Sequence, residues 1–154
     1  MRWLVDLADL RFSYQSFPLQ LADAVTGSDS VCRPVIPVRL IYRDKTLAGY
    51  QYTALIDSGA DWCLFHAEIG TVLEIPIERG QPVSFVGVGG TEQIAYVHPV
   101  KLEVGPWVVA IRAGFVSGLR FPHGLLGQAG FFDQVVVTHY NAPPDRFVDL
   151  NPIK

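Results

Sequence analysis

An acid, a hydroxyl and a glycine directly follow a short apolar segment near the middle of the chain. Residues 52–56 read Tyr-Thr-Ala-Leu-Ile, and Asp57, Ser58 and Gly59 come next. Each type has a task at a reacting centre, because a strand fixes the acid, a hydroxyl tethers the turn and glycine lets backbone approach closely. Residues 124–127, Gly-Leu-Leu-Gly, repeat the pattern of an apolar strand running into glycine. These segments favour hydrolysis by a water that a carboxylate activates.

This chemistry needs a second carboxylate. A pair of nearby carboxylates shares one proton, so that one member acts as base and the other as acid. The chain contains one Asp-Ser/Thr-Gly sequence, at Asp57. We therefore expect a homodimer in which each protomer contributes Asp57 across a two-fold axis. Ser58 is expected to be a tether and not a nucleophile, because the chain has no Gly-x-Ser-x-Gly motif.

Four blocks of the chain resemble the retropepsins, the single-domain retroviral-type aspartic proteases, and especially their small prokaryotic relatives. The resemblance runs from about Val35 to Pro152, and the blocks are residues 34–38, 55–61, 85–91 and 121–127. It implies an all-β fold, a closed acid-protease barrel with one lobe per chain and a homodimeric active site without a cofactor. The catalytic turn would be Asp57, Ser58 and Gly59. The substrate-binding residues would be Ala60, Asp61, Trp62, Gly87, Val88, Gly89, Phe121, His123 and Leu125.

The chain departs from the family pattern at some of these positions. Asp61 fits the family's acid that accepts hydrogen bonds from substrate backbone, but Gln128 stands where the family has an arginine, which removes a charge-assisted contact. Trp62 is expected to fill a subsite or to pack on the dimer partner. The apolar residues expected to line the cleft predict a preference for hydrophobic side chains beside the cleaved bond; they are Trp62, Val88, Phe121 and Leu125.

Residues 87–90, Gly-Val-Gly-Gly, form the expected tip of a flap over the substrate. Three glycines permit the backbone angles of a tight hairpin, and Val88 supplies an apolar contact. The alternative is an ordinary glycine-rich turn without motion. Phosphate binding is not expected, because no Lys-Ser/Thr pair and no helix pattern follow the glycines.

The histidines show no spacing typical of metal ligands, so each is expected to be a surface or capping residue. They are His66, His98, His123 and His139. His123 has a second interpretation, since the resemblance puts it on the wall of the substrate cleft, where its titration would make subsite preference depend on pH.

Composition limits the partners. Of the 154 residues, 18% are charged and 49% hydrophobic, and the net charge is −3. An extensive self-interface suits this balance, whereas nucleic acid does not. The resemblance implies a peptide or unfolded protein as the substrate. No apolar run approaches the roughly 18 residues that span a bilayer, and residues 1–6 do not resemble a signal peptide, so we expect a cytoplasmic protein. Cys32 and Cys63 are expected to be reduced structural thiols, although oxidation of Cys63 beside the catalytic turn stays open.

Turn residues recur every eight to twelve positions, which is typical of an all-β domain. The predicted strands are residues 35–43 and 50–56, joined through residues 44–45, then 100–104, 107–111, 134–140 and 146–150. The predicted helices are residues 66–74 and, immediately after Gly127, residues 128–133.

The chain divides into an N-terminal extension, residues 1–33, and a protease-like domain, residues 34–154. The aromatic content of the extension argues against a disordered tail. It would fill part of the core, extend the dimer sheet or be a removable pro-segment, with residues 27–30 as its expected nicking site.

Two functional hypotheses remain. The first is an aspartic endopeptidase that cuts extended peptides between a flap and a pair of Asp57 carboxylates. The alternative is a catalytically weak dimerisation or peptide-binding module with the same fold. An intact catalytic turn favours the enzyme, because a scaffold has no chemical need for a buried pair of like charges.

Overall fold

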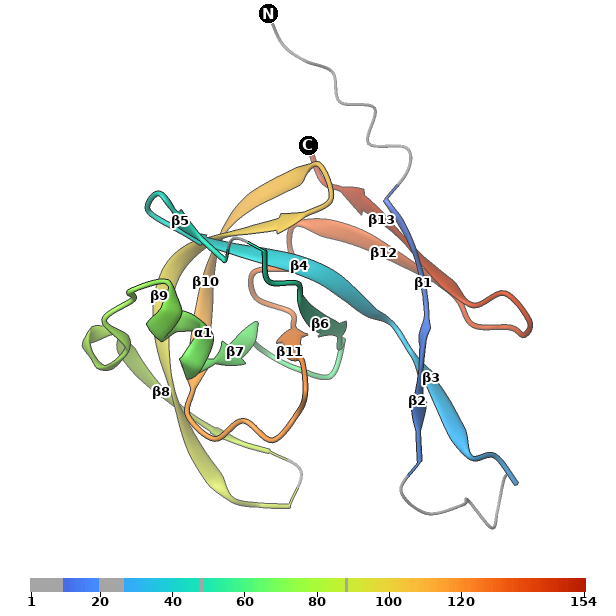
Figure 1. Cartoon of the computed structure of the whole chain (residues 1–154), viewed down its shortest axis with the longest axis horizontal. Coiled ribbons are helices and arrows are strands. Elements are labelled where there is room, and N and C mark those ends of the chain that lie inside the picture. Colours follow the sequence, from blue (N-terminus) through green and yellow to red (C-terminus); the bar gives the residue numbers. More distant parts are fainter. Residues whose placement is uncertain (1–9, 20–26, 48, 88) are drawn as a thin grey trace, which may run out of the picture.

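The computed structural model describes residues 10–19, 27–47, 49–87 and 89–154 (Figure 1). Its strands are β1 (Arg11–Ser13), β2 (Gln15–Pro18), β3 (Ser30–Arg33), β4 (Val35–Tyr42), β5 (Lys45–Thr46), β6 (Tyr52–Ile56), β7 (Leu64–His66), β8 (Gln81–Val86), β9 (Glu92–Val104), β10 (Trp107–Val116), β11 (Gly124–Leu126), β12 (Val135–Tyr140) and β13 (Phe147–Pro152). The helices are α1 (Ala67–Val72) and the single 3₁₀ turn η2 (Ile77–Arg79). The described chain is therefore mostly β, which confirms the predicted fold class.

A ring of paired strands closes into a barrel within the described residues. The strands pair in the order β4, β6, β11, β7, β10 and β9, and β9 pairs back onto β4 through registers such as Leu40 with Leu102. Closure satisfies the backbone groups of these strands without leaving free edges in the ring. The pairs β6–β11 and β7–β10 are parallel, whereas β11 and β7 are antiparallel, so the ends of β6 and β11 meet at one rim of the barrel.

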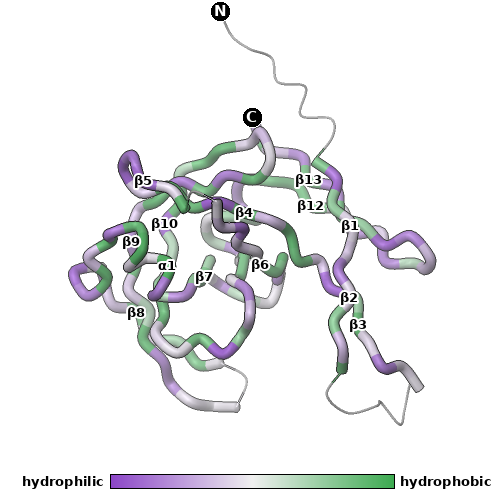
Figure 2. Tube along the Cα trace, viewed as in Figure 1, coloured by the Kyte–Doolittle hydropathy of each residue, from purple (hydrophilic) through white to green (hydrophobic). Residues whose placement is uncertain are grey.

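Alternation of apolar and polar residues explains why these segments form strands. Val100, Leu102 and Val104 on β9 are buried, while Lys101 between them is exposed. Figure 2 shows the hydrophilic residues gathered at the turns, notably those between β4 and β5 and between β12 and β13. The pattern confirms the strands predicted over residues 100–104 and 107–111.

The first predicted hairpin differs in detail. β4 ends at Tyr42, and the chain turns at Arg43, whose φ of 54° is left-handed, and enters β5 before it reaches β6. The turn at residues 43–44 therefore joins β4 to β5, because the polar residues there stay in solvent while Leu47 is buried further on.

The two helix predictions have opposite outcomes. α1 lies inside the predicted range 66–74, and its Gly70 packs so closely that an added Cβ would lie 2.3 Å from Ile77 Cδ1. The helix predicted over residues 128–133 is wrong, since these residues form a succession of turns. Gly130 has a φ of +102° there, which ordinary helix does not contain, and it packs against Cys63 and Ile111.

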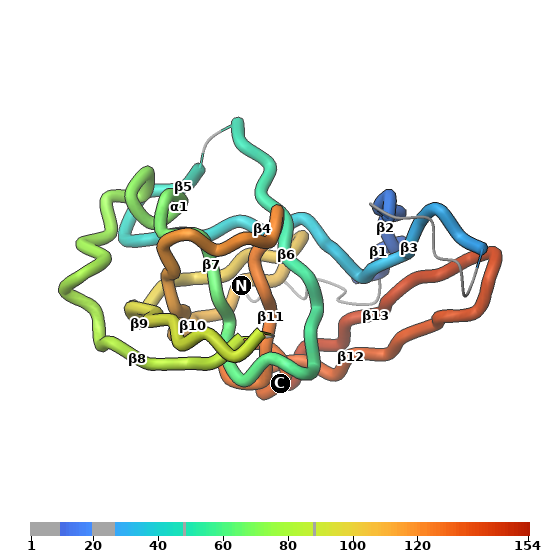
Figure 3. The backbone as a smooth tube through the Cα atoms, turned by 90° about the horizontal axis from the view of Figure 1, so that it is seen from below, coloured from blue at the N-terminus to red at the C-terminus, as the bar shows by residue number. Residues whose placement is uncertain are grey.

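A second sheet lies beside the barrel (Figure 3). It has the order β1, β13, β12, and a separate hairpin of β2 and β3 adjoins it. Both closing strands of the chain, β12 and β13, were predicted, but the pairing of β13 with β1 was not. The side chain of Arg11 on β1 contacts β13. Its guanidinium makes two hydrogen bonds of 2.7 Å to Asp149 and lies 4.0 Å from the ring centroid of Phe147.

Among the described residues, the helices are too short or too polar to cross a membrane.

Candidate active site

Asp57 lies at the end of β6, on a turn held by the neighbouring strand. Its backbone N–H donates to the carbonyl of Leu126 on β11 at 3.0 Å, and Ala60 N–H donates to the carbonyl of Asp57 at 3.2 Å. The carboxylate is half-buried, and its Oδ1 accepts a hydrogen bond from Gly59 N–H at 3.0 Å. The geometry thus gives an accessible carboxylate on a backbone fixed by β-strand pairing.

The turn and the segment after β11 bind each other along their length. Gln128 N–H donates to Ala60 O, and Ala129 N–H donates to Asp61 O, both at 2.9 Å. Gly127 comes directly before Gln128, and a Cβ on it would come within 2.4 Å of Trp62 O and 2.6 Å of Ala60 O. Only glycine lets the two backbones approach this closely.

Gln128 makes a hydrogen bond at the position where the resemblance predicted the loss of a charge-assisted contact. Its Nε2 donates to the carbonyl oxygen of Ser58 at 2.7 Å, so a neutral hydrogen bond joins the segment to the Asp57 turn. The Ser58 side chain is exposed and makes no hydrogen bond to the described part of the chain. Its hydroxyl is therefore accessible from outside the protomer.

The expected flap is a hairpin of β8 and β9. Gly90 N–H donates to Gly87 O at 3.1 Å, and Gly89 and Gly90 have φ values of +112° and +77°, which favour glycine. A Cβ at Gly87, Gly89 or Gly90 would meet no atom within 4 Å, so this tip projects from the body of the barrel. Val88 lies outside the described residues. Movement of the hairpin stays a prediction.

Two of the predicted substrate-binding residues, Trp62 and Leu125, pack together in a small apolar cluster separate from the main core. Its buried members are Leu64, Ala95, Val116 and Leu125, and Leu55, Trp62, Phe85 and Leu119 pack against them. Leu125 is only 8% exposed. Asp61 is exposed beside the cluster and Ala60 is half-buried. Trp62 and Leu125 thus lie together directly behind the Asp57 turn.

His123 and His98 do not lie at the surface, so the surface alternative of the prediction is wrong for both. His123 is 2% exposed, and its ring packs parallel to Phe121 and edge-on to Phe17 of β2. Burial lowers the pKa of His123, and repulsion from Arg33 lowers it further. Its Nε2 has no hydrogen-bond partner among the described residues. His98 is 6% exposed and lies under η2.

A hydrogen-bonded relay that sequence reasoning missed fixes the segment before β11. Nε2 of His66 lies 2.6 Å from the carbonyl oxygen of Phe121, and Nδ1 lies 2.6 Å from the hydroxyl of Tyr52. A carbonyl can only accept, so Nε2 of the neutral ring carries the proton and Nδ1 accepts from Tyr52 O–H. Burial raises the pKa of Tyr52. No spacing signal could reveal this relay, because its members are far apart in sequence.

Cys63 is fully buried next to the catalytic turn, and Cys32 is half-buried on β3; both thiols are free. Burial raises the pKa of Cys63 to about 12. Cys63 is thus protonated at neutral pH and a poor nucleophile, in keeping with the prediction of a structural thiol.

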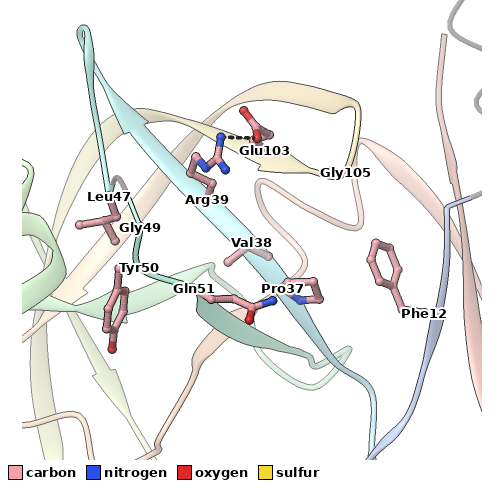
Figure 4. Close-up of a pocket in the computed structure, with 10 residues that line it drawn as sticks. All are labelled: Phe12, Pro37, Val38, Arg39, Leu47, Gly49, Tyr50, Gln51, Glu103 and Gly105. Atoms are coloured by element: carbon pink, nitrogen blue, oxygen red, sulfur yellow. Dashed lines mark ion pairs between the residues drawn. The ribbon is translucent and has the colours of Figure 1, made fainter.

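The described residues contain no group of three or more potential metal ligands. A pocket of about 440 Å³ lies between β1, β4 and the β9–β10 turn, where Arg39 and Glu103 form an ion pair of 3.0 Å (Figure 4). Its wall includes Gln51, before β6, whereas Asp57 follows that strand. The six residue steps from Gln51 to Asp57 span roughly 20 Å along the strand, so this wall of the pocket is remote from Asp57.

A second pocket, of about 230 Å³, lies at the tip of the β8–β9 hairpin. It brings together two predicted site residues, Gly87 and Phe121, and its other walls are Thr91, Gln93, Leu119 and Arg120. We call it the Arg120 pocket.

Comparison with solved structures found EIAV protease complexed with the inhibitor HBY-793. The two chains are 23% identical, with a TM-score of 0.44, and the match covers 62% of this chain and 81% of that one. A comparison with curated proteins found no match.

The family model described as aspartyl protease matches residues 44–129. This range is more than half of the chain, and it includes both the Asp57 turn and the strand β11 that holds it. The described structure gives that match a physical basis, since its one Asp-Ser-Gly turn carries an accessible carboxylate on a fixed backbone. The chain therefore belongs to the aspartyl protease family.

Proposed function

We propose that this chain is an aspartic endopeptidase that acts as a homodimer, with Asp57 of each subunit in one catalytic pair. The observation that carries the proposal is the fixed position of Asp57, whose N–H is bound to Leu126 O while its carboxylate stays accessible. A single such turn in a one-lobed chain requires a second copy to supply the other carboxylate.

The two carboxylates divide the chemistry between them. Mutual repulsion keeps one of them protonated, and the pair titrates as a unit. The ionised Asp57 removes a proton from a water held between the two, and the water oxygen bonds to the peptide carbonyl carbon. The protonated Asp57 of the partner subunit gives its proton to the carbonyl oxygen. The C–N bond then breaks as the amide nitrogen takes a proton from the pair.

The β8–β9 hairpin is the proposed cover for the bound peptide. Val86 and Ile94 on its two strands are 66% and 53% exposed, which leaves apolar side chains free to contact a peptide or a second subunit. An extended peptide would pair with the hairpin by β-type hydrogen bonds, and closure would exclude water from the carboxylates.

Exposed apolar residues near the chain's end support self-association. Val136 and Tyr140 on the edge strand β12 are 56% and 44% exposed, and Ile153 is 59% exposed. An unpaired edge strand with apolar side chains is a ready site for pairing with another copy. The sheet of β1, β13 and β12 is therefore the proposed dimer element.

Cleavage of an unstructured polypeptide such as casein tests the proposal, with wild type beside Asp57→Asn from about pH 4 to 7. We expect the substitution to abolish cleavage and the specific activity of wild type to rise with protein concentration. Asp44→Asn, at an exposed acid in the turn between β4 and β5, is the control. A folded, dimeric wild type that cleaves nothing at any pH would favour the peptide-binding module instead.

A further inference from the structure

The Arg120 pocket has the chemistry to receive a charged side chain. Arg120 is exposed on one wall, and Thr91 and Gln93 bring polar groups to another. Leu119 and Phe121 supply apolar surface beside the guanidinium. This combination suits a side chain with an apolar stem and an anionic end, because the stem packs on the apolar wall and the end meets the guanidinium.

The guanidinium of Arg120 is available to a ligand. The ion pairs among the described residues involve Arg11, Arg39 and Lys45, and none involves Arg120. A planar guanidinium with five N–H donors matches a carboxylate better than any neutral group.

The pocket wall is held in place from behind. Phe121, directly after Arg120, has its carbonyl oxygen bound to Nε2 of His66, and Tyr52 holds the far side of that ring. The backbone that carries Arg120 is thus fixed by a relay anchored on β6 and β7. A preorganised wall loses little conformational entropy when a ligand binds.

The pocket also lies on the path of the peptide. Gly87 belongs both to the pocket wall and to the hairpin that is the proposed cover. A peptide paired with that hairpin points alternate side chains to the same face, so one side chain near the cleaved bond reaches the pocket. Asp57 and Asp61 would repel acidic side chains elsewhere along the path, which makes Arg120 a local exception.

We propose that Arg120 is a specificity-determining residue that selects an acidic side chain at one position of the substrate peptide. This inference rests on the proposed function, since it assigns a subsite to the same cleft. It adds a charged subsite to the hydrophobic preference expected from the sequence.

A pool of random decapeptides, digested and read by mass spectrometry, tests the inference position by position. For wild type we expect glutamate to be enriched over glutamine by about fivefold at one position, the ratio for a partly exposed charge pair. Arg120→Gln should reduce that ratio to about one, and Arg120→Glu should enrich lysine there instead. Arg79→Gln removes an equally exposed arginine on η2 and should leave the enrichment unchanged.

Kinetics with one glutamate peptide and its glutamine counterpart separate binding from chemistry. The glutamate advantage should lie in KM and disappear in Arg120→Gln, while kcat stays near the wild-type value. It should also shrink as salt is raised. A glutamate preference that survives in folded Arg120→Gln, or is absent from wild type, overturns the inference and leaves the protease proposal intact.

Binding to inactive protein distinguishes the two proposals. Fluorescence anisotropy of the labelled peptides on Asp57→Asn, with and without Arg120→Gln, needs no cleavage. If wild type cuts nothing, the protease proposal fails, and a glutamate preference lost with Arg120→Gln still supports the subsite. Equal binding of the glutamate and glutamine peptides to Asp57→Asn overturns the inference of an acidic subsite.

Discussion

At the scale of single residues, neighbouring titratable groups differ in how far they are buried. Asp57 keeps an accessible carboxylate, whereas His123 and Cys63, both close to the catalytic segments, are buried. Burial disfavours the charged forms of these two groups, so it lowers the pKa of His123 and raises that of Cys63.

The buried ring of His123 predicts a pH dependence of stability. Its folded pKa lies below the unfolded value of about 6.5, so the unfolded chain binds more protons and stability falls as the pH drops below that value. His123→Phe should remove this component, which is at most about 1.4 kcal/mol per pH unit. Urea denaturation of both proteins between pH 7.5 and 5 measures it.

The comparison that matters is the difference between the two stability curves. It should be constant above about pH 7 and change in favour of His123→Phe as the pH falls. A difference that stays flat to pH 5 would mean that the imidazole protonates in the folded protein, and the interpretation of His123 as a buried neutral ring would be wrong.

At the scale of elements, the active-site turn depends on close backbone contact between two segments. Residues 57–62 and 126–129 share three backbone hydrogen bonds, and at Gly127 their backbones leave no room for a Cβ. The parallel pairing of β6 with β11 aligns the two segments, since Leu126 lies opposite Ile56. The turn is thus a joint product of both strands.

Gly127→Ala should destabilise the protein by about 2–3 kcal/mol, because a Cβ would collide with the backbone carbonyls of Ala60 and Trp62, which cannot rotate away. Cleavage should fall with it, since Asp57 moves with the turn. Thermal and urea unfolding measure the loss. Gly87→Ala is the stability control, because a Cβ there meets nothing within 4 Å. Equal stability of the two variants would contradict the proposed close contact.

At the scale of the whole molecule, the N-terminal extension joins the C-terminal sheet. β1 pairs with β13, Leu10 is 5% exposed, and Leu150 N–H donates to Leu10 O at 2.9 Å. Phe12 packs against the main core. These contacts favour the view that residues 10–19 complete the domain, over the alternative of a removable pro-segment.

We therefore expect deletion of residues 1–33 to lower the free energy of unfolding by at least about 3 kcal/mol, because it removes a buried leucine and a sheet strand. Leu10→Ala should cost about 2 kcal/mol on its own. Ser16→Ala, at an exposed position on β2, should change little. A truncated protein that keeps its melting temperature and gains activity would show instead that the segment is inhibitory and removable.

The sequence by itself determined where the Asp57 turn lies and most of the barrel. Asp57-Ser58-Gly59 and the paired Gly-Leu-Leu-Gly are short motifs that can be recognised from neighbouring residues alone. The same holds for the alternation of apolar and polar residues in β4, β6, β9 and β10, because side chains on a strand alternate between core and solvent. The closing strands β12 and β13 could be predicted for the same reason.

Tertiary structure decided what depends on contacts between distant residues. One example is Gly130, whose positive φ ends a helical pattern. Two others are contacts between separate segments: His123 packs against Phe17 and Phe121, and Tyr52 bonds to His66. Pairing of β1 with β13 sets residues 11–13 beside residues 147–149. Local propensity does not encode such contacts, since their energy exists only once the barrel has closed and set the segments side by side.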